Sequence, residues 1–261
     1  MGNSPLVSYT RISPNKTSPR NHKIDTISIH CMAGQLSVQS CGNVFASSSR
    51  KASSNYGIGP DGKIGMYVEE KDRSWCTSNA ANDNRAITIE VASDNKAPYA
   101  VTEAAYKSLI DLLVDVCKRN NIKKLLWRGD PTLIGQIHKQ NMTVHRWFAK
   151  KACPGDYLYN KHSQIAADVN KRLGVSTAQL IASAILKPSS TVDSHLPVKK
   201  TALIITPVLN IRSGPGTQYA QVGTVKKGTV CSISQISSNN WGKLADGRGW
   251  ISLNPKYVQT R

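Results

Sequence analysis

Alternating apolar and polar positions predict the strands in the first part of this chain. Residues 24–30 alternate and are rich in β-branched side chains, and residues 85–91 repeat the pattern with the carboxylate of Glu90 near the end. Two short apolar runs, 56–58 and 64–68, flank a Pro-Asp-Gly turn. That combination predicts a hairpin, because proline and glycine supply the dihedral angles of a tight turn.

Helical spacing is clearest over residues 102–119, where apolar side chains recur every three or four positions. Thr102 is the expected N-cap, and a glutamate in the first turn suits the helix dipole. A second helix is expected over 154–173, with Gly174 ending it. Shorter elements are predicted elsewhere: an irregular arm over 1–23, a helix and loop over 35–48, a strand over 125–128, and a helix from Asp130 to about Ile137.

The chain changes character after residue 200. Short β-type runs separated by Gly, Asn and Asp turns predict a small β-barrel over 201–261, with strands at 202–205, 221–225, 229–236 and 249–252. Residues 175–200 contain prolines and serines and few acidic groups, which is typical of a linker, although 178–186 could form a short helix. We therefore expect two domains, 1–174 and 201–261, joined by a linker at 175–200.

Charge adds a prediction about partners. The formal net charge is +18, with 24 Lys and Arg against 14 Asp and Glu up to Gly174, and 10 against 2 beyond it. Such a balance favours an anionic partner, namely nucleic acid, an acidic membrane face or a polyanionic cell wall; the alternative is that it only aids solubility. No apolar run approaches the ~20 residues of a membrane span, so stable membrane insertion is not expected. The N-terminus has neither the basic segment nor the apolar core of a signal peptide, which predicts that the protein is first kept in a cytoplasm.

Histidine and cysteine positions suggest a metal centre. None of the six cysteines forms a CxxC pair, which excludes a four-cysteine zinc ribbon. His30 ends the first strand, and His145 and Cys153 stand eight positions apart later in the chain. Each alone is more typical of a structural residue, but together they are the ligand set of an open, catalytic zinc site. The remaining histidines are expected at the surface: His22, His138, His162 and His195. Of these, His138 is the main competitor for a ligand role.

Five motifs give the chain a family resemblance over about residues 20–174. They are Ser28-Ile29-His30, 55–58, 87–91, 144–146 and 151–155, and they resemble, in order, the motifs of zinc N-acetylmuramoyl-L-alanine amidases of the phage-lysozyme and peptidoglycan-recognition type. The resemblance implies an α/β fold with a mixed central β-sheet flanked by helices. It also implies cleavage of the amide between the lactyl group of N-acetylmuramic acid and L-alanine of the stem peptide.

The same resemblance assigns site residues. It implies that His30, His145 and Cys153 hold one Zn²⁺, and a third ligand at Cys153 favours an enzyme over a non-catalytic recognition protein.

The resemblance also supplies catalytic candidates. Glu90 would take the proton of the attacking water and pass one to the leaving amine. Lys151 would offset the developing oxyanion, and Tyr56 matches a tyrosine that shares this role in some relatives. The alternatives are core packing for Tyr56 and simple solvation for Lys151.

The sequence departs from that family at Cys76, where many relatives carry a polar residue facing the substrate. This departure leaves the metal ligands intact but puts the substrate contacts there in question. A neighbouring group of polar residues is expected either to line the groove or to be a plain loop: Asn79, Asn82, Asp83 and Asn84.

The final block resembles bacterial SH3-like wall-binding domains. The resemblance rests on residues 209–216, with their Asn-x-Arg-x-Gly-Pro signature, and on 241–244 and 249–251. It implies a small all-β SH3-like barrel that binds the cell wall. At least one of Trp241 and Trp250 is expected in its core, and Tyr219 is a candidate for stacking on sugars or peptides.

The resulting hypothesis is a phage endolysin that waits in the host cytoplasm until lysis and then acts on the cell wall. Its expected partners are peptidoglycan and anionic wall polymers. A bacterial autolysin of the same chemistry is the first alternative, and a non-catalytic peptidoglycan-recognition protein is the second. Nucleic-acid binding rests on charge alone and lacks a recognition motif, so it is not expected.

Overall fold

The computed structural model describes residues 2–175, 200–217, 219–237 and 240–260. The chain divides into two compact units, one before and one after the boundary at Leu186 and Lys187. The predicted linker at 175–200, with its possible helix at 178–186, lies almost wholly outside the described residues. Among the residues that are described, no helix has the length and apolar composition needed to cross a membrane.

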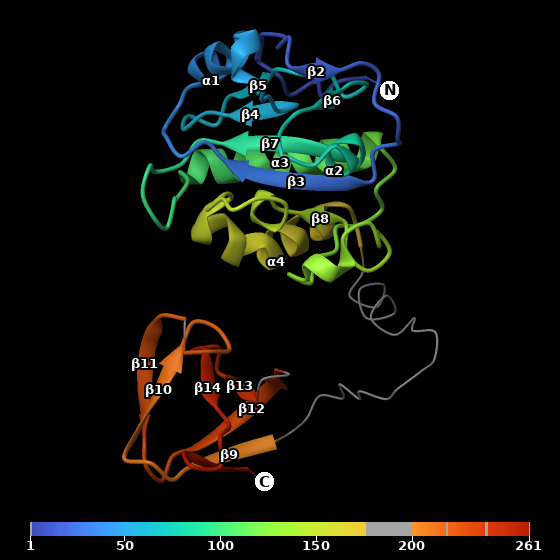
Figure 1. The fold of residues 1–261 in the computed structure, drawn as a ribbon. Helices are drawn as coiled ribbons and strands as arrows, with labels where there is room; N and C mark the ends of the chain where they lie inside the picture. Colours follow the sequence, from blue (N-terminus) through green and yellow to red (C-terminus); the bar gives the residue numbers. More distant parts are fainter. Residues whose placement is uncertain (1, 176–199, 218, 238–239, 261) are drawn as a thin grey trace. The chain divides into compact units, whose positions relative to one another are not determined.

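A six-stranded sheet forms the centre of the first unit (Figure 1). The pairings β3–β7, β3–β8, β4–β7 and β1–β5 are parallel, whereas β4–β5 is the predicted antiparallel hairpin. The sheet is therefore mixed, as the resemblance implied. Its strands, in spatial order, are β1 (Tyr9–Thr10), β5 (Ile64–Met66), β4 (Tyr56–Ile58), β7 (Ala86–Val91), β3 (Thr26–Cys31) and β8 (Met142–Thr143).

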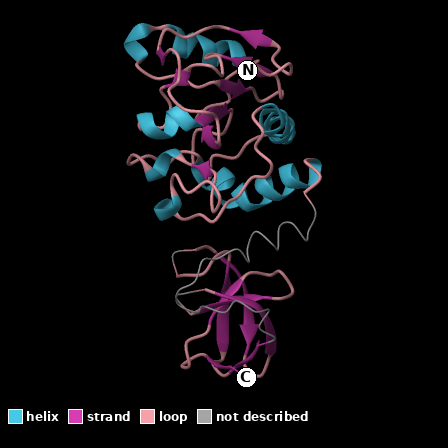
Figure 2. Cartoon of the chain, turned by 90° about the vertical axis from the view of Figure 1, so that its right-hand side faces the viewer, coloured by secondary structure: helices cyan, strands magenta, loops and turns pink. Residues whose placement is uncertain are grey.

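Helices pack against this sheet (Figures 1 and 2). The two longest contact each other, and together they touch β3, β4 and β7, while the first helix contacts β1, β4 and β5. The α-helices in the described part of this unit are α1 (Val38–Ala46), α2 (Ala80–Arg85), α3 (Glu103–Arg119) and α4 (Gly155–Arg172). The minor elements are the strand pair β2 (Lys16–Thr17) and β6 (Arg73–Ser74), and the 3₁₀ turns η1 (Ser48–Arg50), η2 (Pro131–Leu133) and η3 (His145–Trp147).

The predicted ends of the long helices are confirmed. The hydroxyl of Thr102 accepts a hydrogen bond from the amide of Ala105 at 3.1 Å and so satisfies a donor in the first turn of α3. Gly174 follows the C-cap of α4 with φ of 77°, a conformation in which glycine carries no steric cost.

Residues 125–128 do not form the predicted strand. Three of their backbone amides instead donate to side-chain oxygens of Asn170, Asn141 and Gln140, at 2.7, 2.7 and 3.0 Å. The apolar run therefore has buried partners for its backbone without belonging to a sheet.

Two other local predictions are also wrong. The helix expected from Asp130 to about Ile137 shortens to the single turn η2, and Gly135 has φ of 83°, outside helical geometry. The N-terminal arm is not wholly irregular, since β1 joins the central sheet and β2 pairs with β6.

The second unit is a seven-stranded, antiparallel all-β domain with an aliphatic core. Its predicted strands are confirmed, and the described residues hold three more at positions that the alternation did not reveal, two between the predicted strands and one after the last of them. Trp241 and Trp250 are partly exposed, so the expectation that one fills the core is wrong; the core side chains are smaller and aliphatic. The strands are β9 (Lys200–Ile204), β10 (Val208–Arg212), β11 (Gln221–Lys226), β12 (Val230–Ile236), β13 (Trp241–Leu244), β14 (Trp250–Ser252) and β15 (Val258–Thr260).

Candidate metal centre

The three predicted metal ligands converge. One ligand atom from each of His30, His145 and Cys153 lies within 4.8 Å of the other two. Nδ1 of His30 is 3.3 Å from Sγ of Cys153, and the two imidazole rings have centroids 5.3 Å apart. Residues more than a hundred positions apart in the sequence thus form one cluster with the donor set that zinc prefers.

The order of the parallel strands places these ligands. His30 lies near the C-terminal end of β3, and β8 runs parallel beside β3 before the chain enters η3 at His145. Cys153 directly precedes Pro154, the N-cap residue of α4, and its carbonyl accepts a hydrogen bond from the amide of Arg146 at 3.1 Å. Side chains that follow the carboxyl ends of parallel strands meet at one edge of the sheet, which is where α/β proteins build their sites.

The remaining nitrogen of each imidazole has its own partner. Nε2 of His30 is hydrogen-bonded with the hydroxyl of Ser28, and Nε2 of His145 with the hydroxyl of Ser78, both at 3.1 Å. Such outer partners orient a ligating imidazole and select its tautomer, and in His30 they leave Nδ1, the nitrogen near Cys153, for a cation. Ser28 stands in the first of the five family motifs, although the motif does not indicate that its hydroxyl meets the imidazole, and no motif marks Ser78.

The electrostatic setting also fits a cation. Burial, followed by the charges of His145 and His162, lowers the pKa of His30 to about 3. Burial and then Lys151 lower the pKa of His145, so both imidazoles are held neutral, as ligation requires. A hydrogen bond with Cys31 and burial raise the pKa of the Cys153 thiol, and a bound cation would oppose that shift by favouring the thiolate.

Glu90 lies beside this cluster. It pairs in register with His30 across β7 and β3, so both side chains are on the same face of the sheet. Its Oε2 is buried and has no hydrogen-bond partner in the described part of the chain. Burial is the main reason that its pKa rises to about 8. A carboxyl oxygen left unpaired in this position is available to a substrate, a water or a cation.

Lys151 and Tyr56 are placed differently from each other. Lys151 is exposed and close enough to His145 to lower the pKa of that imidazole.

Tyr56 pairs in register with Ile89, so its side chain is on the opposite face from Glu90 and lies in the core. Its hydroxyl donates to Oε1 of Glu70 at 2.6 Å and accepts from the amide of Ser4 at 2.9 Å. The structure therefore contradicts a polarising role for Tyr56 and supports the packing alternative.

None of the other histidines within the described residues joins the cluster. His22 and His138 lie at the surface as predicted, and His195 is outside the described residues. His162 corrects the prediction of a surface group, because it is fully buried in α4, with its ring centroid 4.3 Å from that of Trp127.

The polar segment 79–84 is not an open loop. It forms α2, capped by the Asn79 side chain, and Asp83 is buried. The carboxylate of Asp83 accepts hydrogen bonds from the amides of Cys76 and Thr77 at 2.9 and 3.1 Å. This arrangement fixes the loop that carries Cys76.

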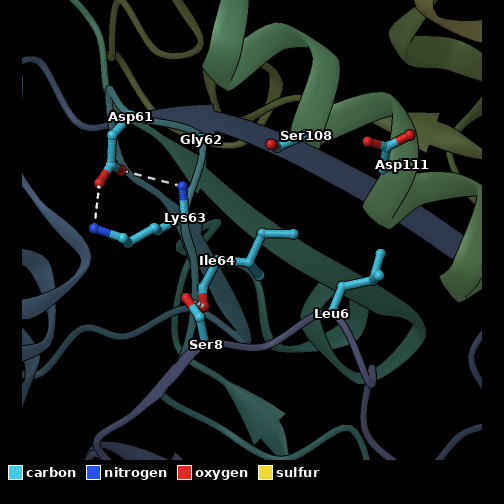
Figure 3. Close-up of a pocket in the computed structure, with 8 residues that line it drawn as sticks. All are labelled: Leu6, Ser8, Asp61, Gly62, Lys63, Ile64, Ser108 and Asp111. Carbon is cyan, nitrogen blue, oxygen red and sulfur yellow. Dashed lines mark hydrogen bonds and ion pairs between the residues drawn. The ribbon is translucent and has the colours of Figure 1, made fainter.

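A shallow pocket elsewhere in the first unit shares no residue with the cluster (Figure 3). It is lined by side chains from the N-terminal arm, the β4–β5 turn and α3, and Asp61 and Lys63 form an ion pair of 2.9 Å within it. No predicted site residue lies there, and the two opposite charges at its edge neutralise each other.

Comparisons with known proteins agree with this description. Two family models match the chain: N-acetylmuramoyl-L-alanine amidase over residues 20–156 and bacterial SH3 domain over residues 207–259. No curated protein matches.

Solved structures also resemble the chain, and two of the three given below are an endolysin or an amidase by title. A mutant endolysin from Bacillus subtilis is 16% identical, with 62% of this chain and 97% of that chain covered and a TM-score of 0.46. The N-acetylmuramoyl-L-alanine amidase LysC from Clostridium intestinale is also 16% identical, with 65% and 96% covered and a TM-score of 0.42. The structure of PlyL is 13% identical, with 62% and 95% covered and a TM-score of 0.47.

The amidase family match spans more than half of the chain and includes all three converging ligands and Glu90. The protein therefore belongs to the N-acetylmuramoyl-L-alanine amidase family and carries a bacterial SH3 domain after its catalytic unit.

Proposed function

We propose that this peptidoglycan amidase is zinc-dependent and serves as a phage endolysin in host lysis. Its substrate bond would be the amide between the lactyl group of N-acetylmuramic acid and L-alanine of the stem peptide. The observation that carries the zinc assignment is the convergence of His30, His145 and Cys153 beside the unpaired Oε2 of Glu90.

His30, His145 and Cys153 would hold the ion, with Ser28 and Ser78 fixing the two imidazoles. When bound, zinc supplies Lewis acidity, which polarises a carbonyl and lowers the pKa of water toward about 7. Three protein ligands leave room for water or substrate, as in other catalytic zinc sites.

Glu90 is the proposed general base. Its free Oε2 would accept a proton from the attacking water and return one to the leaving amine. This role requires the ionised carboxylate, and a cation nearby would favour ionisation against the effect of burial. Lys151, exposed beside His145, is the proposed partner of the developing oxyanion.

The second unit is proposed to anchor the enzyme on the wall. Beyond Gly174 the chain has 10 basic against 2 acidic residues, which suits a polyanionic wall polymer as well as peptidoglycan. In this proposal the enzyme is held in the host cytoplasm until lysis. An autolysin with the same chemistry remains the alternative biological role.

Digestion of purified peptidoglycan, with and without a chelator, tests the chemistry. We expect new L-alanine amino termini that disappear with the chelator and return with Zn²⁺. New reducing sugar ends would instead indicate a glycosidase. Cys153→Ala should abolish product formation, whereas Cys41→Ala, which removes a buried thiol of α1 outside the cluster, should not.

Sedimentation with purified walls tests the anchor. Residues 201–261, which lie within one compact unit, should sediment with the walls, and high salt should weaken this binding if anionic polymers contribute. A fragment that stays in solution would contradict the anchoring role.

A further inference from the structure

A second group of metal-ligating side chains adjoins the proposed zinc ligands. One ligand atom each from His30, Cys76 and Glu90 lies within 4.8 Å of the other two. Sγ of Cys76 is 3.9 Å from Oε1 of Glu90, and the other oxygen of this carboxylate is buried without a partner among the described residues. This cluster shares its imidazole with the first but has its own thiol and its own carboxylate.

The position of the Cys76 thiol is fixed by the structure around it. The backbone amide of Cys76 donates to the carboxylate of Asp83 at 2.9 Å, and the hydroxyl of Thr77 donates to the same buried carboxylate at 2.6 Å. Glu90 is fixed from the other side by its register with His30 on the neighbouring strand. The Cys76 thiol and the Glu90 carboxyl are therefore held close together by a hydrogen-bonded loop and a central strand. Binding of a cation would cost little conformational entropy in these two side chains.

We propose that His30, Cys76 and Glu90 form a second, inhibitory position for a soft divalent cation such as Zn²⁺ or Cd²⁺. Imidazole, thiolate and carboxylate are all zinc ligands, and a thiolate favours the softer cations over Mg²⁺ or Ca²⁺. Binding releases the protons of the Cys76 thiol and of the protonated Glu90 carboxyl to solvent. Glu90 Oε2 then acquires a partner, which it lacks in the described residues of the free protein.

Inhibition follows from the shared residues, and this part rests on the proposed function. A cation held by Glu90 occupies the carboxylate that is proposed to accept the proton of water. The first cation should therefore support activity, and cation in excess should remove it.

Cadmium titration of the full-length protein tests the site without relying on activity, because each cadmium–thiolate bond adds ultraviolet charge-transfer absorption. We expect wild type to show a second absorption increase beyond the first equivalent, and Cys76→Ser to lose that increase while keeping the first. Cys41→Ser is the matched control, since it removes another thiol of the first unit that is outside both clusters. Cys76→Ala serves if the serine variant does not fold, as judged by circular dichroism.

Amidase activity is measured in parallel at rising Zn²⁺. For each protein, activity in excess Zn²⁺ is divided by the activity of the same protein at one equivalent. Activity of wild type should fall as Zn²⁺ is raised above one equivalent, and the ratio of activity in excess Zn²⁺ to activity at one equivalent should stay near unity in Cys76→Ser. A single absorption step in wild type, or a second step that Cys76→Ser retains, would overturn the inhibitory site.

The two proposals fail in different ways. Cys153→Ala should lose amidase activity but retain the absorption change that depends on Cys76. Cys31 is hydrogen-bonded with Cys153 and could replace it as a ligand. The double variant Cys31→Ser, Cys153→Ala removes both thiols, so that the remaining absorption change can be assigned to Cys76. Absence of amide cleavage at one equivalent would contradict the zinc mechanism, whereas the Cys76-dependent step would still report the second site.

Discussion

His162 should make the first unit sensitive to mild acid. The imidazole is fully buried in α4, where Nδ1 donates to the carbonyl of Leu158 at 2.7 Å. Its Nε2 has no partner in the described part of the chain. Burial, with a smaller contribution from the charge of Arg146, lowers its pKa from 6.5 to about 4. Protonation would place a charge on a buried ring that packs against Trp127.

The sign and size of the effect follow from linkage. As pH falls, the unfolded chain takes up the proton at its ordinary pKa, before the folded protein does. The contribution of this group to the free energy of unfolding is therefore highest above the unfolded pKa of 6.5, and it falls as pH drops toward the folded pKa of about 4. For this one group, the free energy of unfolding drops by about 2 kcal/mol between about pH 7 and about pH 5, and by about 3 kcal/mol at about pH 4.

His162→Phe removes the titrating group while keeping an aromatic ring against Trp127. Urea unfolding of apoprotein in chelator, followed by far-ultraviolet circular dichroism, reports the first unit, because the helices of the described residues lie there. Between about pH 7 and about pH 5, the free energy of unfolding should fall in both proteins. The fall should be ~2 kcal/mol smaller in the variant than in wild type. His138→Phe is the control, since that ring is exposed and substitution should leave the pH dependence unchanged. Equal losses in wild type and His162→Phe would refute the reasoning.

Three further substitutions separate structural from catalytic roles. Tyr56→Phe should keep amidase activity while lowering the free energy of unfolding by about 1–3 kcal/mol, measured by urea unfolding, because its hydroxyl bonds lie in the core. Ser78→Ala should weaken metal affinity by about 10–100-fold in a competition titration, because it removes the partner of His145 Nε2. Asn170→Ala should cost at least ~1–3 kcal/mol in the same unfolding assay, because the amide and carbonyl of Leu125 both lose their partner.

Each of these has a clear contrary result. A Tyr56→Phe enzyme with normal stability and little activity would restore the catalytic role that the structure contradicts. Unchanged metal affinity in Ser78→Ala, with Ser78→Thr as the variant that keeps a hydroxyl, would show that the serine does not orient the imidazole. An Asn170→Ala protein as stable as wild type would mean that water replaces the lost amide.

Much of the fold could be predicted because its signals are local. The β-branched alternation of β3 and β7, the cap at Thr102 and the glycine after α4 each act through neighbouring residues in the chain. The ligands His30, His145 and Cys153 were found through family motifs and donor chemistry, and they lie together as expected.

The tertiary structure decided what depends on pairing between distant segments. The register of β4 with β7 put Tyr56 in the core, and side-chain amides took the place of a sheet partner along 125–128. The packing of the loop at Cys76 over Glu90 is likewise invisible in the sequence, because it depends on a buried Asp83 that appeared to be part of a polar loop. Periodicity and capping are properties of one segment, whereas the face, partner and burial of a side chain are set by the segments that fold against it.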